Sequence, residues 1–129
     1  MAFNLFYLGI ININTDYISL SEKMLSVVSS GIVESTAYFA NWTKLQMLIT
    51  DPPFEVVLVG EKCMDLNRTL NKYYLPGTLI TGSKKKSNLP LLQNKLIENQ
   101  TSIYICKDRV CSLPFTDLTE ALGHIGFMP

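Results

Sequence analysis

The stretch DPPFEVVLVG, residues 51–60, separates two parts of the sequence that differ in periodicity. A proline lacks the backbone donor and biases the residue before it away from helical conformation, so a preceding helix must end before Pro52. The run that follows is mostly apolar, rich in β-branched residues and ended by Gly60, which is typical of a strand buried on both faces. The sequence therefore predicts a helical segment over residues 1–50 and a small three-layer α/β unit over residues 51–129.

Three helices are predicted before this boundary. Residues 2–10 are apolar on nearly all sides, so a helix here must be covered on most sides by other parts of a protein. A second helix follows a cap at Thr15 or Asp16 and ends at Gly31, and a third occupies about residues 35–50. The first helix would expose an apolar patch if nothing covered it, so we expect self-association or packing against further helices.

Strands and helices alternate after the boundary. The predicted strands cover residues 54–59, 78–81 and 101–106. The predicted helices cover residues 61–74, a short segment from about residue 90, and a last segment from about residue 118. Such alternation implies right-handed crossovers between parallel strands. The predicted fold class is α/β, with a three-stranded, mostly parallel sheet covered by helices and preceded by the all-helical segment.

Composition and charge restrict the class of protein. At 129 residues, with 47% apolar and 17% charged side chains, the chain is long and apolar enough to bury a core. Eleven basic and eleven acidic residues cancel, so we expect neither nucleic acid nor a membrane as a partner. The start lacks the basic region of a signal peptide, no apolar run reaches about 20 residues, and three cysteines are an odd number for a disulfide scaffold. We expect a cytoplasmic protein.

Two cysteines, Cys106 and Cys111, form the main candidate site. If the third strand turns back at Asp108 and Arg109, the cysteines face each other with Cα atoms about 4.5 Å apart, within the roughly 4.4–6.8 Å that a disulfide accepts. A reactive thiol needs a lowered pKa, yet Lys107 and Arg109 alternate with the cysteine and point away from it in a hairpin. Three interpretations stay open: buried apolar core residues, a reversible disulfide, or part of a metal site.

No cofactor or metal is expected. A four-ligand zinc site would need Cys63, Cys106, Cys111 and His124 to converge, and their spacing matches no recurrent zinc pattern. Gly60 stands alone where a dinucleotide-binding fingerprint has three glycines, so a nucleotide site is disfavoured.

Other polar and aromatic features have simple structural explanations. Asp51 and Glu55 flank the prolines, and we expect a surface linker there rather than a carboxylate pair. We expect the three lysines at residues 84–86 to belong to a solvated loop. Tyr38 and Trp42 could stack on a sugar, but aromatic residues at helical spacing usually belong to a core.

Three segments resemble the C-terminal portion of the spermatogenesis-associated, thioredoxin-domain-containing protein family. They are TAYFANWTKLQMLITDPPFEVVLVGE (residues 36–61), YLPGTLI (74–80) and CKDRVCSLPFTDLTEAL (106–122). The positions that match the family's pattern are Pro53, Val56 to Gly60, Cys111, Pro114, Thr116 and Asp117. The resemblance covers nearly the whole chain.

The resemblance implies a larger context. Members of this family are several times longer, with an N-terminal thioredoxin-like domain carrying a Cys-x-x-Cys type motif and a central (α/α) toroid similar to glycosidases and sugar epimerases. Residues 1–50 would then be the last toroid helices, and the chain a C-terminal fragment that packs against the toroid.

Three functions follow from these expectations. The first is a non-catalytic structural region of a thioredoxin-domain-containing protein. The second is a thiol-disulfide redox or thiol-sensing role through Cys106 and Cys111, alone or as a resolving pair for a thioredoxin domain in trans. The third is carbohydrate binding by the helical segment.

Overall fold

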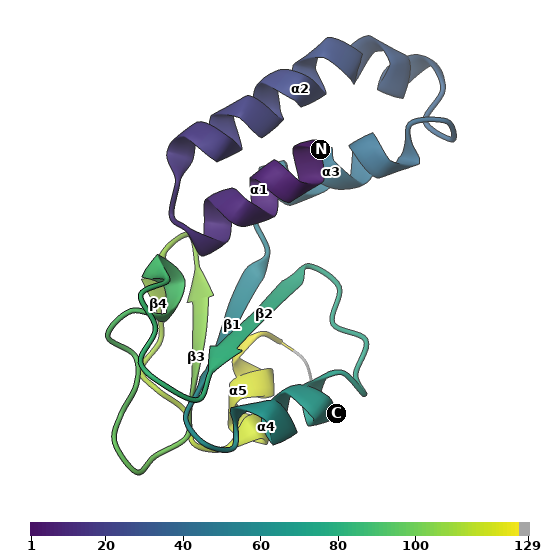
Figure 1. Ribbon diagram of the computed structural model, residues 1–129. Helices are drawn as coiled ribbons and strands as arrows, with labels where there is room; N and C mark the ends of the chain where they lie inside the picture. Colours follow the sequence, from purple (N-terminus) through teal and green to yellow (C-terminus); the bar gives the residue numbers. More distant parts are fainter. Residues whose placement is uncertain (127–129) are drawn as a thin grey trace. The chain divides into compact units, whose positions relative to one another are not determined.

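The computed structural model of the chain describes residues 1–126 (Figure 1). It divides into two compact units, Met1–Pro52 and a second unit that begins at Pro53, so the division falls between the two prolines. The last three residues of the predicted α/β unit, 127–129, lie outside the described residues. Within residues 1–126, no helix is long and apolar enough to cross a membrane.

The first unit contains three helices, α1 (Ala2–Ile11), α2 (Thr15–Glu34) and α3 (Ala40–Thr50). The side chain of Asn14 caps α2 by accepting hydrogen bonds from the backbone amides of Asp16 and Tyr17, so the cap lies one residue before the predicted one. The predicted end of this helix at Gly31 is wrong. A Cβ atom at Gly31 would lie 2.5 Å from the Phe39 ring, so the glycine makes room for that ring inside a continuing helix.

All three helices contribute to the core of the first unit. Phe6 and Leu45 are among its buried side chains, and Trp42 packs against them from α3. The buried hydroxyl of Ser21 on α2 donates a hydrogen bond of 3.0 Å to the carbonyl of Ala2 on α1, which satisfies both groups.

The second unit is built on a four-stranded sheet. Its strands are β1 (Phe54–Val59), β2 (Thr78–Ser83), β3 (Ser102–Lys107) and β4 (Val110–Cys111). Its helices are α4 (Cys63–Leu70), the 3-10 helix η1 (Pro90–Leu92) and α5 (Leu118–His124). The α/β class is confirmed.

The prediction of three mostly parallel strands is wrong. The strand order is β2-β1-β3-β4; β1 pairs with β2 in parallel, whereas β1–β3 and β3–β4 are antiparallel, so the sheet is mixed. The reason lies between β2 and β3, where no α-helical crossover forms. The helix predicted from Pro90 is a single 3-10 turn, and Asn94 and Asn99 beyond it have left-handed backbones with φ of 59°. The chain returns through this loop in the antiparallel direction.

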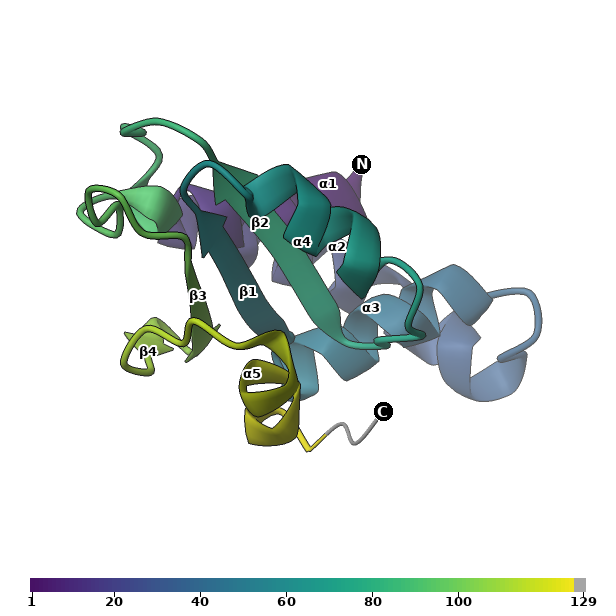
Figure 2. The ribbon, with the colours of Figure 1, turned by 90° about the horizontal axis from the view of Figure 1, so that it is seen from below.

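The central strand β1 is buried on both faces, as predicted. Val56 and Leu58 point to the face covered by α4 and α5, which lie on the same side of the sheet in Figure 2. Val57 and Val59 point to the other face, where Leu91 and Leu92 of η1 cover them. All four β1 side chains are at most 1% exposed. We call the face covered by α4 and α5 the helix-covered face. We call the opposite face the disulfide face, because it carries Cys106 and Cys111.

Candidate functional site

The strands β3 and β4 form the predicted hairpin. The two turn residues, Asp108 and Arg109, have φ of 51° and 69°, which is the backbone of the two-residue turn that suits twisted antiparallel strands. Lys107 pairs with Val110 and Cys106 with Cys111, so the predicted register is confirmed. Aspartate is among the residues that tolerate this left-handed conformation best, which favours a turn at this position.

The two cysteines are joined by a disulfide, with Cα atoms 3.9 Å apart, which is closer than the predicted distance of about 4.5 Å and below the usual lower limit of roughly 4.4 Å. Cys106 is completely buried in the core of the disulfide face, whereas Cys111 is partly exposed. Of the three interpretations left open by the sequence, the covalent pair is the one present. The bond links a sulfur that solvent cannot reach to one at the margin of the core.

Glu55 lies beside this bond, in a place that the sequence analysis misjudged. It belongs to β1, pairs with Cys106 across the antiparallel ladder, and is only 5% exposed, so the expectation of a surface linker is wrong. Side chains of paired residues point to the same face with Cβ atoms about 4.5–5.5 Å apart. Glu55, Cys106 and Cys111 therefore form a row across β1, β3 and β4. The strand pattern could have located this carboxyl, because Glu55 shares a face with Val57 and Val59 in a strand that was predicted to be buried on both faces.

The surroundings of Glu55 disfavour its charged form. Burial raises the pKa of its carboxyl above the ordinary value of 4.5, and the carboxylate of Asp108 raises this pKa further. The cations of Lys95 and Arg109 lower the pKa of Glu55 but do not cancel the effect of burial. Glu55 thus holds its proton over a wider pH range than an exposed glutamate.

Buried polar atoms without a partner gather on the disulfide face. Among the described residues, the side-chain oxygens in this condition are Oε2 of Glu55, Oγ1 of Thr81 and Oγ of Ser102. Thr81 pairs with Val57 and Ser102 with Val59, so both point to the same face as Glu55. Such atoms are costly and rare in folded proteins, and they call for an explanation.

The four residues of the hypothetical zinc site do not converge. Cys63 belongs to the core of the helix-covered face, whereas Cys106 and Cys111 belong to the opposite face. His124 of α5 packs with its ring centroid 5.4 Å from that of Phe115. Within residues 1–126, no group of three potential metal ligands comes together.

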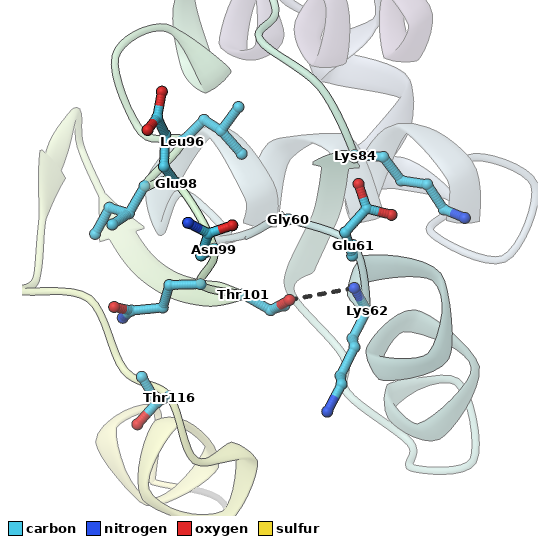
Figure 3. A pocket seen from close by; sticks show the side chains of 11 residues that line it. Gly60, Glu61, Lys62, Lys84, Leu96, Glu98, Asn99, Thr101 and Thr116 are labelled. Atoms are coloured by element: carbon cyan, nitrogen blue, oxygen red, sulfur yellow. Dashed lines mark hydrogen bonds between the residues drawn. The ribbon is translucent and has the colours of Figure 1, made fainter.

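A hollow of about 630 Å³ opens at the carboxyl end of β1 (Figure 3). Its lining includes Gly60, Lys62, Lys84, Thr101 and Thr116. Gly60 has a φ of +115°, and a Cβ atom there would lie 2.5 Å from the carbonyl oxygen of Gln100, so only glycine fits.

Three backbone amides of the turn between β1 and α4 are engaged in hydrogen bonds within the protein. The amide of Gly60 donates to the carbonyl of Ser83, that of Lys62 to the hydroxyl of Thr101, and that of Cys63 to the carbonyl of Gly60. These three donors are therefore not available to bind an anion.

The two aromatic residues considered for sugar binding, Tyr38 and Trp42, differ in burial. Tyr38 is 90% exposed in the turn between α2 and α3, whereas Trp42 packs against the core of the first unit. Comparison with family models, curated proteins and solved structures finds no match to this chain. The case for a function therefore depends on the geometry of the site.

Proposed function

We propose that Cys106 and Cys111 are a redox-active disulfide that accepts electrons from a dithiol. The observation that carries the proposal is the unequal burial of the bonded pair, with Cys106 enclosed and Cys111 partly exposed. Exchange proceeds by attack of a thiolate on one sulfur, so access decides which sulfur is attacked. Here the attacked atom is Sγ of Cys111, and the leaving group is Cys106.

The exchange balances as a two-electron transfer. The first thiolate of the dithiol bonds to Sγ of Cys111, the Cys106–Cys111 bond breaks, and Cys106 leaves with the electron pair. The second thiolate of the dithiol then attacks its own neighbouring sulfur and releases Cys111. The products are an oxidised dithiol and two thiols in the hairpin.

The charges around the hairpin fit this assignment. The ammonium group of Lys107 lies 4.8 Å from the ring centroid of Phe54, which packs on the helix-covered face, so Lys107 points away from the cysteines as predicted. Arg109 in the turn lowers the pKa of the Glu55 carboxyl, so its positive charge is felt at this end of the hairpin. Its cation favours the approach of an anionic thiolate.

The partner follows from the resemblance to thioredoxin-domain-containing proteins. Members of that family carry a thioredoxin-like domain with a Cys-x-x-Cys type motif, and we propose a domain of this kind, acting in trans, as the dithiol. This chain would then be a C-terminal unit whose hairpin receives electrons from that domain.

A redox titration tests the proposal. The chain is equilibrated in a series of glutathione buffers, alkylated and analysed by mass spectrometry. We expect Cys106 and Cys111 to gain labels together with a midpoint in the roughly −220 to −320 mV range of cytosolic potentials. Cys63, which is buried on the other face, is the internal control and stays unlabelled in the native protein. A pair that gains labels only on unfolding would overturn the proposal.

A structural role is the second candidate, and the surface of the first unit favours it. Several apolar side chains of α2, α3 and the turn between them project into solvent: Val27 (81% exposed), Val33 (86%), Tyr38 (90%) and Met47 (67%). Large exposed apolar patches mark surfaces that bind other protein elements. We propose that these helices pack against others, as the end of a helical toroid would. In the isolated chain the other helices can come only from a second copy, so we expect self-association; light scattering across a concentration series tests this, and a monomer at every concentration contradicts it.

A further inference from the structure

Glu55 has an unexplained oxygen beside the disulfide. Its Oε2 atom is buried and has no hydrogen-bond partner, although a buried carboxyl oxygen without one is unfavourable. Its cross-strand neighbour is Cys106, the sulfur that solvent cannot reach. In the oxidised protein this sulfur has no proton to donate.

Reduction of the disulfide supplies the missing donor. A thiol at Cys106 carries an S–H group, and a buried thiolate is costly because its charge is not solvated. Glu55 is the carboxyl paired with Cys106 across the ladder, so it is placed to supply the proton that neutralises this sulfur. The unpartnered oxygen is thus explained as the acceptor of a hydrogen bond from the Cys106 S–H group, a donor that exists only in the reduced state.

We propose that Glu55 carries the proton to and from Sγ of Cys106, an assignment that rests on the redox function proposed above. When Cys106 leaves as a thiolate, it takes the proton of the Glu55 carboxyl, which leaves a neutral thiol and a carboxylate. In reoxidation the carboxylate removes that proton, and the Cys106 thiolate attacks the sulfur of a mixed disulfide at Cys111. The partner's thiolate leaves, and Glu55 keeps the proton that the next reduction requires.

The groups that face Glu55 set the pH range of this step. Asp108 and Arg109 act from the turn and Lys95 from the loop after η1, with opposing effects on the pKa of Glu55 that leave it raised, chiefly through burial. Tyr104 lies on the same face of β3, and its hydroxyl donates a hydrogen bond of 3.0 Å to the carbonyl of Lys95. Burial raises the pKa of Tyr104, so this hydroxyl stays neutral where the carboxyl titrates.

The test follows reoxidation of the fully reduced chain by oxidised glutathione from about pH 5 to pH 9, with rapid acid quenching and mass spectrometry. The first step forms a mixed disulfide at Cys111, and the second, in which Cys106 attacks it, needs the base. In Glu55→Gln we expect this second step to slow about 10²-fold, the mixed disulfide to accumulate, and the inflection due to Glu55 to disappear from the pH profile. Glu120→Gln, which changes an exposed carboxyl of α5, is the control and keeps the wild-type profile.

The outcomes separate this inference from the redox function. If the pair cycles in Glu55→Gln with the wild-type rate and pH profile, Glu55 carries no proton, although the redox function stands. If the Cys106–Cys111 disulfide is never reduced in the native wild-type chain, the redox function is contradicted, and this inference, which depends on it, is contradicted as well. Should Glu55→Gln not fold, Glu55→Asp replaces it. A shifted inflection in Glu55→Asp supports the role, and an unchanged one contradicts it.

Discussion

The two faces of the sheet in the second unit are built on different principles. The helix-covered face is a continuous apolar core in which Leu58 and Ile103 pack against α4 and α5. The disulfide face is covered by η1 and its loop, and it holds Glu55 and the buried oxygens that lack partners within residues 1–126. The helix-covered face is packed as a stable apolar core. The disulfide face contains buried polar groups that lower stability, and functional sites are usually found among such groups.

The largest effect that this comparison predicts is on the helix-covered face. Leu58→Ala removes a side chain that is 1% exposed, and we expect the free energy of unfolding to fall by about 2–5 kcal/mol because a cavity remains. Urea unfolding followed by circular dichroism measures it. Leu113→Ala, at a site 86% exposed, makes the same chemical change and should stay within about 0.5 kcal/mol. Equal losses at both sites would remove the distinction between core and surface.

Reduction of the disulfide is the next largest effect. The bond closes a loop between residues five apart in the sequence, so its loss should lower the free energy of unfolding by about 2 kcal/mol through chain entropy. Urea unfolding with and without dithiothreitol measures the difference. The double variant Cys106→Ala with Cys111→Ala should no longer respond to dithiothreitol. If it still responds, the reductant acts elsewhere.

Two buried serines make a sharper comparison. Ser102→Ala removes a hydroxyl that has no partner, so the free energy of unfolding should stay unchanged or rise by up to about 1 kcal/mol. Ser21→Ala in the first unit removes a hydroxyl that bonds to the carbonyl of Ala2, and it should cost about 1 kcal/mol. The two variants are compared by the urea midpoint at one pH. A loss at Ser102 as large as at Ser21 means that Ser102 has a partner in solution.

The finest distinction is in the pH dependence of stability. The folded-state pKa of Glu55 lies above its unfolded value of 4.5, so its contribution to stability is fully present below about pH 4.5 and is lost as the pH rises through the folded-state pKa. Glu55→Gln does not titrate and should lose less stability over that interval. Thermal unfolding of both chains from acid to neutral pH measures the two slopes. Parallel slopes would show that Glu55 has an ordinary pKa in the folded state.

The sequence was a good guide where a local rule decides the structure. A two-residue turn at Asp108 and Arg109 forces Cys106 opposite Cys111, so the pairing could be derived by counting residues. The burial of β1 on both faces followed in the same way from its apolar run.

Long-range pairing could not be derived in this way. The direction of β3 depends on how the chain returns from β2, and the pattern after Pro90 looked helical although Asn94 and Asn99 adopt left-handed backbones. The burial of Glu55 beside Cys106 was missed for a related reason. Its neighbour Cys106 is distant in the sequence, and only the strand register brings the two together.

The two-residue turn at Asp108 and Arg109 also determines which thiols can stay bonded to Cys111. Because the ladder pair of Lys107 and Val110 holds both thiols opposite each other without the bond, the local concentration of Cys106 around Cys111 is far higher than that of any thiol in solution. We therefore expect Cys106 to attack a mixed disulfide between Cys111 and a single thiol, and to release that thiol before the mixed disulfide accumulates. Under the redox role proposed above, a dithiol therefore reduces the pair faster than a monothiol such as glutathione does, although both reach the same equilibrium at a given potential.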